Sequence, residues 1–540
     1  MTRESNLTML KNTIAILLML CAVAGVAGEL NGWLLPTVSW PFTVSREMSF
    51  LHISGHYVPD LEVDGAFHWF GWLSMVVLFI AGLYLLLRPA AGMRMAPERA
   101  KRWKRFCSMK RAWWSFLLLL FLLLLAALDQ CVVGKRALAV KYAGQWYFPA
   151  FTRAIIPGDT FGLVGDDALA EADYRELALS VGLPDAPEVV VMPPIPYDPV
   201  SDAASFPTEP LELRKDGRYY RKDSDKPFNG IASRLYEDGM PHMRTRCRRG
   251  LPDGYVQGWS RDRREVYAAR YSAGEMTEHH FNGLGTVEEF EKLTDPKNAC
   301  VVYYHPAPPL SGGHLLGTDS RGADIAAVLY GGLQVCIVAS LFYLPIIYGI
   351  GLTLGMLMGY FGGKWDMLVQ RVIEILSQLP FLFVVMILAD ALPLEMRGMF
   401  LILSLLALFG WMRMTYLVRT ATMKEKTREY VAAARVMGAG TVRVLLKHIL
   451  PNITGIVVTL LPFSVAAVVF SLTSLDYLGF GLPESYASWG RLLNDGLSRL
   501  SSPWVVSSAF LALVITLLLV TFVGEGVREA CDPRRRTYYE

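Results

Sequence analysis

The chain has 540 residues, of which 53% are hydrophobic and 19% are charged, and its formal net charge is +3. Typical soluble domains carry about 25% charged residues, so this deficit in a long chain indicates several membrane-spanning segments. The composition excludes a mainly disordered protein, a coiled coil and a disulfide-stapled secreted scaffold. The small net charge does not favour nucleic acid as a partner.

Apolar runs that approach or exceed the roughly 20 residues needed to cross a hydrocarbon core recur along the chain. In order they cover 12–35, 67–87, 113–133, 335–360, 367–392, 400–418, 453–478 and 505–523. We therefore expect an all-α polytopic membrane protein with about eight transmembrane helices. The first run follows Lys11 and contains small residues, as a signal peptide would. We favour a retained span, because the chain returns to the membrane soon afterwards.

The distribution of basic residues predicts the orientation in the membrane, because cytoplasmic loops carry an excess of Lys and Arg. Between the second and third runs only Glu98 opposes a basic cluster, which comprises Arg88, Arg94, Arg99, Lys101, Arg102, Lys104, Arg105, Lys110 and Arg111. The loop 419–447 and the tail with Arg534, Arg535 and Arg536 are also basic, whereas the loop 36–66 is acidic through Glu47, Asp60, Glu62 and Asp64. Both termini are expected in the cytoplasm and residues 134–324 outside.

The predicted domain boundaries follow these spans. Residues 1–112 form an N-terminal extension with two transmembrane helices and a basic cytoplasmic loop, and 113–133 is the first helix of a transmembrane core. An inserted β-rich extracytoplasmic domain occupies 134–324, the remaining transmembrane domain 325–527, and a cytoplasmic tail 528–540.

The outer segment contains an internal repeat between about 215 and 283. The same interval separates Gly230 from Gly254 and Gly250 from Gly274, and aromatic-then-charged stretches begin at Tyr236 and Trp259. This pattern predicts β-hairpins side by side, with glycine supplying positive φ at the turns. It resembles MORN-like repeats, which implies a docking or gating surface outside the membrane. An irregular β-rich loop is the alternative.

The positions of cysteine and histidine bear on crosslinks and metal ligands. Cys247 and Cys300 lie in the outer segment, where an oxidising compartment permits a disulfide, but spacing alone does not establish contact. Two unpaired thiols are the alternative. The histidines show no metal-ligand spacing, because His279 and His280 would face opposite sides of a strand, and because His52, His56 and His68 lie in or beside a loop. No metal site is expected.

The most informative stretch is the cytoplasmic loop 429–452. Ala432, Ala433 and Ala434 are helix formers without bulk, and Gly438 suits the left-handed conformation that ends a helix. Pro451 suits the first turn of a following span. The pattern predicts a helix, a glycine break and a second helix, small enough to sit in the groove of another protein.

This loop resembles the EAA loop of bacterial ABC importer permeases, with Glu429, Ala433, Ala434, Gly438 and Pro451 at the motif positions. Further stretches resemble the oligopeptide and dipeptide permeases, at 314–324, 329–332, 359–363, 478–481 and 488–490. The stretches 141–149 and 473–481 resemble the microcin C-type branch, which imports oligopeptides. The resemblance covers 111–150 and 314–532. The first two spans and the long outer segment depart from it.

The resemblance implies one half of the pore of an ATP-driven peptide importer in the bacterial inner membrane. The implied partners are a second permease subunit, two ATPase subunits or one fused ATPase, and an extracytoplasmic peptide-binding protein. No phosphate-binding Gly-x-x-x-x-Gly-Lys-[Ser/Thr] loop occurs in the sequence. We therefore expect no enzymatic site and no cofactor in this chain, with ATP bound by the partner subunits.

Polar residues within the spans are candidates for the translocation path, because ionisable groups there are costly. Glu374 lies three residues after Arg371 and could pair with it, while Asp476 lies beside a glycine-rich turn. Asp476 would either line the path or hold the turn. Gln378 and Pro380 predict a kinked helix, although intramembrane proline also serves packing alone.

Two other functions were weighed. A secondary transporter usually shows inverted repeats and paired intramembrane charges, and no inverted repeat is found in the sequence. A membrane-anchored scaffold with the repeat as its working part would not need an EAA-like loop.

Overall fold

The structure is a computed structural model that describes residues 2–39, 41–42, 69–87, 97–163, 169–181, 186–200, 208–222, 224–235, 241–260, 264–281, 299–391 and 398–531. Several sequence predictions lie outside the described residues. They concern the acidic outer loop, the tail arginines, Arg88, Arg94, the stretch 236–239, and His52, His56 and His68.

The chain divides into two compact units. One comprises Met1–Val200, Ala327–Asn494 and Ala509–Glu540, and the other comprises Ser201–Ala326 and Asp495–Ser508. The predicted outer segment 134–324 is therefore split near residue 200. The reason is that Ile195 and Tyr197 return to pack with Val133, Ala327 and Tyr330 at the ends of two spans. The predicted boundaries follow membrane spans rather than compactness, and they stay predictions.

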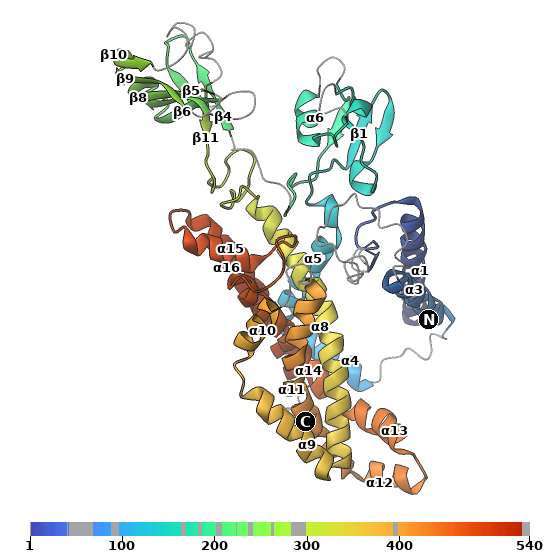
Figure 1. Ribbon diagram of the computed structural model, residues 1–540. Helices are drawn as coiled ribbons and strands as arrows, with labels where there is room; N and C mark the ends of the chain where they lie inside the picture. Colours follow the sequence, from blue (N-terminus) through green and yellow to red (C-terminus); the bar gives the residue numbers. More distant parts are fainter. Residues whose placement is uncertain are drawn as a thin grey trace. The chain divides into compact units, whose positions relative to one another are not determined.

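The first unit contains the apolar helices (Figure 1). Six helical stretches are long and apolar enough to cross a membrane. They are Lys11–Asn31 within α1 (Thr2–Asn31), α5 (Lys110–Ala127), α8 (Ile325–Phe361), α11 (Met399–Lys426), Thr441–Tyr477 and α16 (Pro503–Cys531). Within the helix α3 (Trp69–Leu87), the stretch Gly71–Leu87 is apolar but shorter than these six. The described residues thus give six or seven spans by length and composition, against about eight expected from the sequence.

The predicted span 367–392 is not one helix. It consists of α9 (Gly363–Ser377) and α10 (Phe381–Asp390), which are bent by 79° relative to each other. Pro380 lies at the break. Proline lacks an N–H, and it disfavours helical backbone in the residue before it, here Leu379. The expected kink is therefore a complete break.

The close approach of α8 and α11 depends on three glycines at a four-residue spacing. A Cβ at Gly355 would lie 2.7 Å from the carbonyl oxygen of Thr415, and one at Gly359 would lie 2.7 Å from that of Arg419. A Cβ at Gly351 would lie 2.7 Å from the side chain of Met414. Small residues at this spacing let membrane helices pack backbone to backbone. This contact holds the C-terminal part of α8 against α11.

Shorter elements complete the first unit. They are α4 (Pro97–Ser108), η2 (Asp129–Cys131), β1 (Ala139–Tyr142), β2 (Gln145–Tyr147), η3 (Pro149–Phe151), η4 (Gly158–Phe161), α6 (Tyr174–Ser180), β3 (Val189–Val191) and α15 (Trp489–Ser498), the last of which continues into the second unit. The strands form an antiparallel sheet in the order β2-β1-β3. The C-terminal end of α1 is tied to this region, because Glu29 pairs with Arg153 and the Gln130 amide donates to the Leu34 carbonyl at 2.8 Å.

The second unit is built on an eight-stranded sheet. Its strands are β4 (Thr208–Leu213), β5 (Tyr219–Arg221), β6 (Gly230–Leu235), β7 (Pro241–Arg248), β8 (Leu251–Trp259), β9 (Glu265–Ser272), β10 (Glu275–Phe281) and β11 (Cys300–Val302). Their order is β10-β9-β8-β7-β6-β11-β4-β5.

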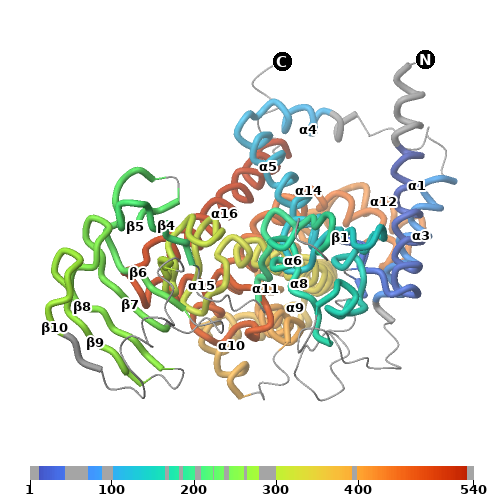
Figure 2. The backbone as a smooth tube through the Cα atoms, turned by 90° about the horizontal axis from the view of Figure 1, so that it is seen from above, coloured from blue at the N-terminus to red at the C-terminus, as the bar shows by residue number. Residues whose placement is uncertain are grey.

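Strands β6 to β10 form successive antiparallel hairpins. Figure 2 shows these strands lying side by side. The turns at Arg249–Gly250 and Ala273–Gly274 both have positive φ at their two central residues, as two-residue hairpin turns require. The predicted hairpins are confirmed.

The two cysteines of the outer segment point to opposite faces of this sheet. Cys247 lies in a core cluster with Ala299 and Val301. Because successive side chains of a strand alternate, Cys300 lies on the other face, and its thiol donates to the Ser233 carbonyl at 3.4 Å. Both thiols are free, so the alternative of two unpaired thiols holds in this structure. Burial raises the pKa of Cys247 to about 11.

Candidate functional site: the loop between α11 and α14

The predicted first helix of the cytoplasmic loop is α12 (Glu429–Val436). Glu429 lies in its first turn and Arg435 in its last, so both charges complement the helix dipole. Val431 and Ala434 are buried, with 0% and 1% exposed, whereas Ala433 is exposed. The two motif alanines therefore differ: Ala434 packs inside the protein, and Ala433 faces outward.

The glycine break closes the helix in the expected way. Gly438 has φ +82°, the left-handed conformation that favours glycine. Around it the N–H of Met437 donates to the Ala433 carbonyl at 3.0 Å, and the N–H of Ala439 donates to that of Ala434 at 3.0 Å. These bonds satisfy the carbonyl groups at the end of α12.

The second helix differs from a plain α-helix. It begins with α13 (Thr441–Arg443), continues as a π-helical segment η8 (Val444–Ile449) and runs into α14 (Leu450–Tyr477), with Pro451 in the first turn of α14. The position of Pro451 agrees with the sequence prediction. The π-helical segment was not predicted; such segments are rare and frequent at functional sites.

The loop is fixed to the ends of the spans by a buried cluster. Val431, Val444 and Ile449 are each 0% exposed and pack with Met356 of α8 and Val418 of α11. The Tyr430 hydroxyl donates to Glu425 at 2.8 Å, and burial, followed by this carboxylate, raises the pKa of Tyr430 to about 12. The backbone of the loop is thereby held in place.

A tyrosine that the sequence analysis did not single out as a site residue joins α8 to the loop. The ring of Tyr360 lies under two cations, with Arg435 of α12 at 4.8 Å and Lys426 of α11 at 5.8 Å from its centroid. Cation–π contacts of this kind are attractive by about 0.5–1 kcal/mol at exposed sites. Tyr360 thus connects three helices where they meet.

Apolar side chains of the loop are exposed on the surface of the chain, and we call this group the tip surface. Its members are exposed to unusual degrees for their type: Val436 89%, Met437 80%, Val442 68% and Leu446 54%. Arg435, Arg443 and Lys447 flank them and are exposed as well. Contiguous exposed apolar residues with a polar rim are typical of a protein-binding site.

A buried ion pair braces the neighbouring spans. Arg419 of α11 donates from Nε and Nη2 to the two oxygens of Asp366 in α9, at 2.5 and 2.6 Å. Both side chains are mostly buried. Sequence reasoning missed this pair, because the partners are far apart in the chain. The expected pair of Arg371 and Glu374 is present at 2.6 Å, with both side chains largely exposed.

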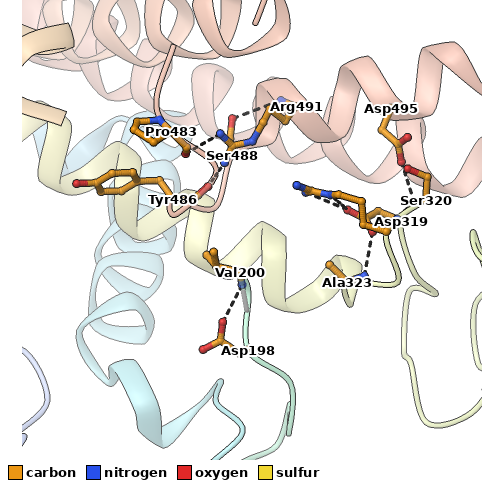
Figure 3. Close-up of polar contacts among 11 residues, drawn as sticks. Asp198, Val200, Asp319, Ser320, Ala323, Pro483, Tyr486, Ser488, Arg491 and Asp495 are labelled. Atoms are coloured by element: carbon orange, nitrogen blue, oxygen red, sulfur yellow. Dashed lines mark hydrogen bonds and ion pairs between the residues drawn. The ribbon is translucent and has the colours of Figure 1, made fainter. Parts of the chain in front are cut away.

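Asp476 holds a turn at the C-terminal end of α14. Its carboxylate accepts from the N–H of Leu482 at 2.7 Å and from the hydroxyl of Ser488 at 2.5 Å. Arg491 closes the same turn by donating to the carbonyl oxygen of Leu482. It also donates to the carbonyl oxygens of Pro483 and Tyr486 (Figure 3). These bonds give Asp476 a structural role, and its place on a translocation path stays a prediction.

The two other candidate path residues lie in and after α9. Gln378 follows α9 at its C-terminal end and is exposed, and Glu374 also accepts from the Gln370 amide at 3.2 Å. Their role in transport stays a prediction. Among the residues that the structure describes, no group of His, Cys, Asp and Glu is arranged to hold a metal ion.

In the second unit the segment 314–324 is internally hydrogen-bonded. His314 and Asp324 are joined at 2.9 Å, and both side chains are buried. The Asp319 carboxylate accepts from the N–H groups of Arg321 and Ala323, and the N–H of Ser320 donates to Asp495 at 2.9 Å (Figure 3). The segment is therefore held together by its own hydrogen bonds directly before α8 begins.

Several apolar helices of membrane-spanning length, with a braced helix pair between two of them, define a polytopic membrane component. Residues 351–537 match the family described as binding-protein-dependent transport system inner membrane component. The chain belongs to this family, because it is also 36% identical over 231 residues to the oligopeptide transport system permease protein OppC of Haemophilus influenzae. That match covers 43% of this chain and 73% of the relative.

Two relatives match over a greater length. The chain is 28% identical over 459 residues to the peptidoglycan transport system permease protein YejE of Agrobacterium fabrum, covering 84% of this chain and 98% of that protein. It is 27% identical over 442 residues to the inner membrane ABC transporter permease protein YejE of Escherichia coli, covering 82% and 99%. The likeness thus extends well beyond the part shared with OppC.

Proposed function

We propose that this chain is the permease subunit of an ABC importer for peptides and forms half of its translocation pore. The observation that carries the proposal is the tip surface on a rigidly braced loop, at the positions where importer permeases carry the EAA motif. The names of the OppC and YejE relatives, which refer to oligopeptide and peptidoglycan transport, support a peptide-containing substrate. In its finer form, the proposal is that this chain belongs to the microcin C-type branch of these importers.

The proposed partners follow from the family of the chain and, for the ATPases, from the tip surface. ATPase subunits, either two chains or one fused chain, dock on the tip surface and supply the energy, since this chain carries no nucleotide-binding loop of its own. A second permease subunit completes the pore, and an external binding protein delivers the peptide. ATP-driven closure of the ATPases then moves α12 and, through Tyr360 and the buried cluster, the inner ends of α8 and α11.

The sheet of the second unit is proposed as a MORN-like accessory surface outside the membrane. Its exposed side carries arginines over aromatic rings: Arg244 lies 4.9 Å from the ring of Tyr304 and 5.8 Å from that of Trp259, and Arg270 lies 5.6 Å from that of Tyr255. Such a surface suits an acidic or planar group of the binding protein or of the arriving peptide.

The experiment that tests the proposal introduces negative charges into the tip surface. Val436→Asp combined with Met437→Asp should abolish co-purification of the ATPase subunits in mild detergent and ATP-dependent peptide uptake in membrane vesicles. Both side chains are exposed, so the fold should persist. Tyr255→Asp, at a 67% exposed position of the outer sheet, is the matched control and should leave ATPase binding unchanged.

The same measurements separate the alternatives. A secondary transporter would take up substrate without the ATPase subunits, and a scaffold would show no uptake at all. The proposed orientation, with both termini in the cytoplasm, is checked by impermeant thiol labelling. A cysteine at Ser224 should react from outside in intact spheroplasts, and one at Thr427 only after lysis.

A further inference from the structure

The helix α4 lies directly before the span α5. A single residue, Met109, separates the two helices and has non-helical backbone angles, φ −82° and ψ 95°. Its N–H donates to the Phe106 carbonyl at 3.1 Å, and its own carbonyl accepts from the N–H of Trp113 at 2.9 Å. The turn is therefore closed on both sides, and α4 ends where α5 begins.

One side of α4 is packed against the ends of two spans. Phe106 is 4% exposed and lies with Ala112 of α5 and Ala530 of α16. Gly526 of α16 provides the space, since a Cβ there would come within 2.3 Å of the Ala112 side chain and 3.0 Å of the Phe106 ring. Figure 2 shows α4 beside α5. The orientation of α4 about its own axis is thereby fixed.

Tryptophan rings surround this junction. Trp103 stacks on Phe106 at 5.8 Å and meets Trp113 edge-on at 6.2 Å, yet it remains 49% exposed, and Trp114 is 69% exposed. Tryptophan is enriched at the boundary between hydrocarbon and water. Two exposed tryptophans at the beginning of a span therefore mark the level of the lipid headgroups.

The opposite side of α4 is basic. Lys101, Lys104 and Arg105 share one face at helical spacing, and Lys110 and Arg111 follow at the start of α5. Lys101, Lys104 and Lys110 are exposed. Within the described part of the chain, none of these three lysines forms an ion pair with an acidic side chain. Their charges are available to a ligand.

We propose that α4 binds the headgroups of anionic phospholipids, using Lys101, Lys104 and Arg105, with Lys110 and Arg111 beside them. A basic amphipathic helix with aromatic residues lies in the plane of the interface, and each basic residue near an anionic leaflet contributes about 1 kcal/mol. A protein partner is disfavoured, because the apolar side of α4 is already covered by α5 and α16. Lipid binding at this site ties the inner ends of these spans to the membrane surface.

The test uses the full chain, purified with its partner subunits and equilibrated with mixed phosphatidylcholine and phosphatidylglycerol. Retained lipid is extracted and quantified by mass spectrometry. Removing three charges by Lys101→Gln, Lys104→Gln and Arg105→Gln should lower the preference for phosphatidylglycerol by about 100-fold at low salt. The single change Lys104→Gln should lower it by about fivefold. High salt should weaken the preference of the unaltered chain.

Matched variants decide the outcome. Lys215→Gln, Lys222→Gln and Arg248→Gln remove three exposed charges from the second unit and should leave the preference unchanged. Lys101→Arg with Lys104→Arg keeps the charge and should also preserve it. Equal lipid preference in the triple α4 variant and the unaltered chain would overturn the proposal. Loss of ATPase subunits with unchanged lipid retention would overturn it too, because α4 would then be a protein contact.

Discussion

The loop between α11 and α14 and the hairpins of the second unit both present exposed side chains on a supported backbone, but the support differs. In the loop, two short helices are held by the burial of Val431, Val444 and Ile449 against the ends of spans. In the sheet, neighbouring strands hold one another through backbone hydrogen bonds. The loop should therefore respond strongly to a change in one buried side chain, whereas the sheet should tolerate changes at many positions.

The largest effect is expected where the loop is buried. Ala434→Asp places a charge at a site that is 1% exposed, which costs several kcal/mol because no partner is available to it. We expect the protein to insert but to lose ATPase binding, with peptide uptake falling at least 100-fold.

Ala433→Asp is the matched control for this change, since Ala433 is the exposed neighbour on the same helix. It should weaken ATPase binding only because the new charge lies on the contact surface. It should leave the melting temperature of the purified chain unchanged. If both variants lower the melting temperature equally, the assignment of a buried and an exposed alanine is wrong.

A smaller effect is expected from removing the hairpins altogether. Deletion of 215–283, closed with a short Gly/Ser linker, leaves every candidate span and the loop intact. We expect membrane insertion and ATPase co-purification to persist, and uptake to fall several-fold because the accessory surface is lost. Loss of the ATPases in this variant would show that the two regions are not separable. Normal uptake would assign the sheet to another partner.

The sequence predicted the loop better than the surroundings that hold it. Helix formers, Gly438 and Pro451 act locally, so their spacing indicated two helices and the break between them. The pairing of Arg419 with Asp366 and the stacking of Arg435 on Tyr360 join residues far apart in the chain, and no local pattern encodes them. The break at Pro380 was underestimated, because a proline alone does not reveal whether neighbouring helices will stabilise a kink or a 79° bend.

The hairpins show the same limit. Recurring glycines predicted the turns at Gly250 and Gly274, because the backbone there needs positive φ. The insertion of β11 between β6 and β4 was not predictable, since it pairs residues 300–302 with strands that lie much earlier in the chain. Periodicity indicated local pairing but not this long-range order.

A still smaller effect is expected at the contact between α8 and the loop. Tyr360→Leu removes the aromatic ring that lies under Arg435 and Lys426, at an expected cost of about 1 kcal/mol per contact or less. The ATPase subunits should still bind, but the number of peptides taken up per ATP hydrolysed should fall several-fold. Tyr360→Phe keeps the ring and should behave like the unaltered chain. Equal coupling in the leucine and unaltered proteins would contradict this role.

The smallest effect is expected from the cysteines of the sheet, and it tests the sheet rather than the loop. Because Cys247 and Cys300 lie on opposite faces, mild oxidation should not join them, and mass spectrometry of alkylated peptides without reduction should recover both as separate thiols. The raised pKa of Cys247, about 11, leaves little thiolate at pH 8, so maleimide should label it slowly until the protein is unfolded. Cys300→Ser should change neither the melting temperature nor uptake. A recovered Cys247–Cys300 disulfide would require a different register of β11, and with it a different surface on the outer sheet.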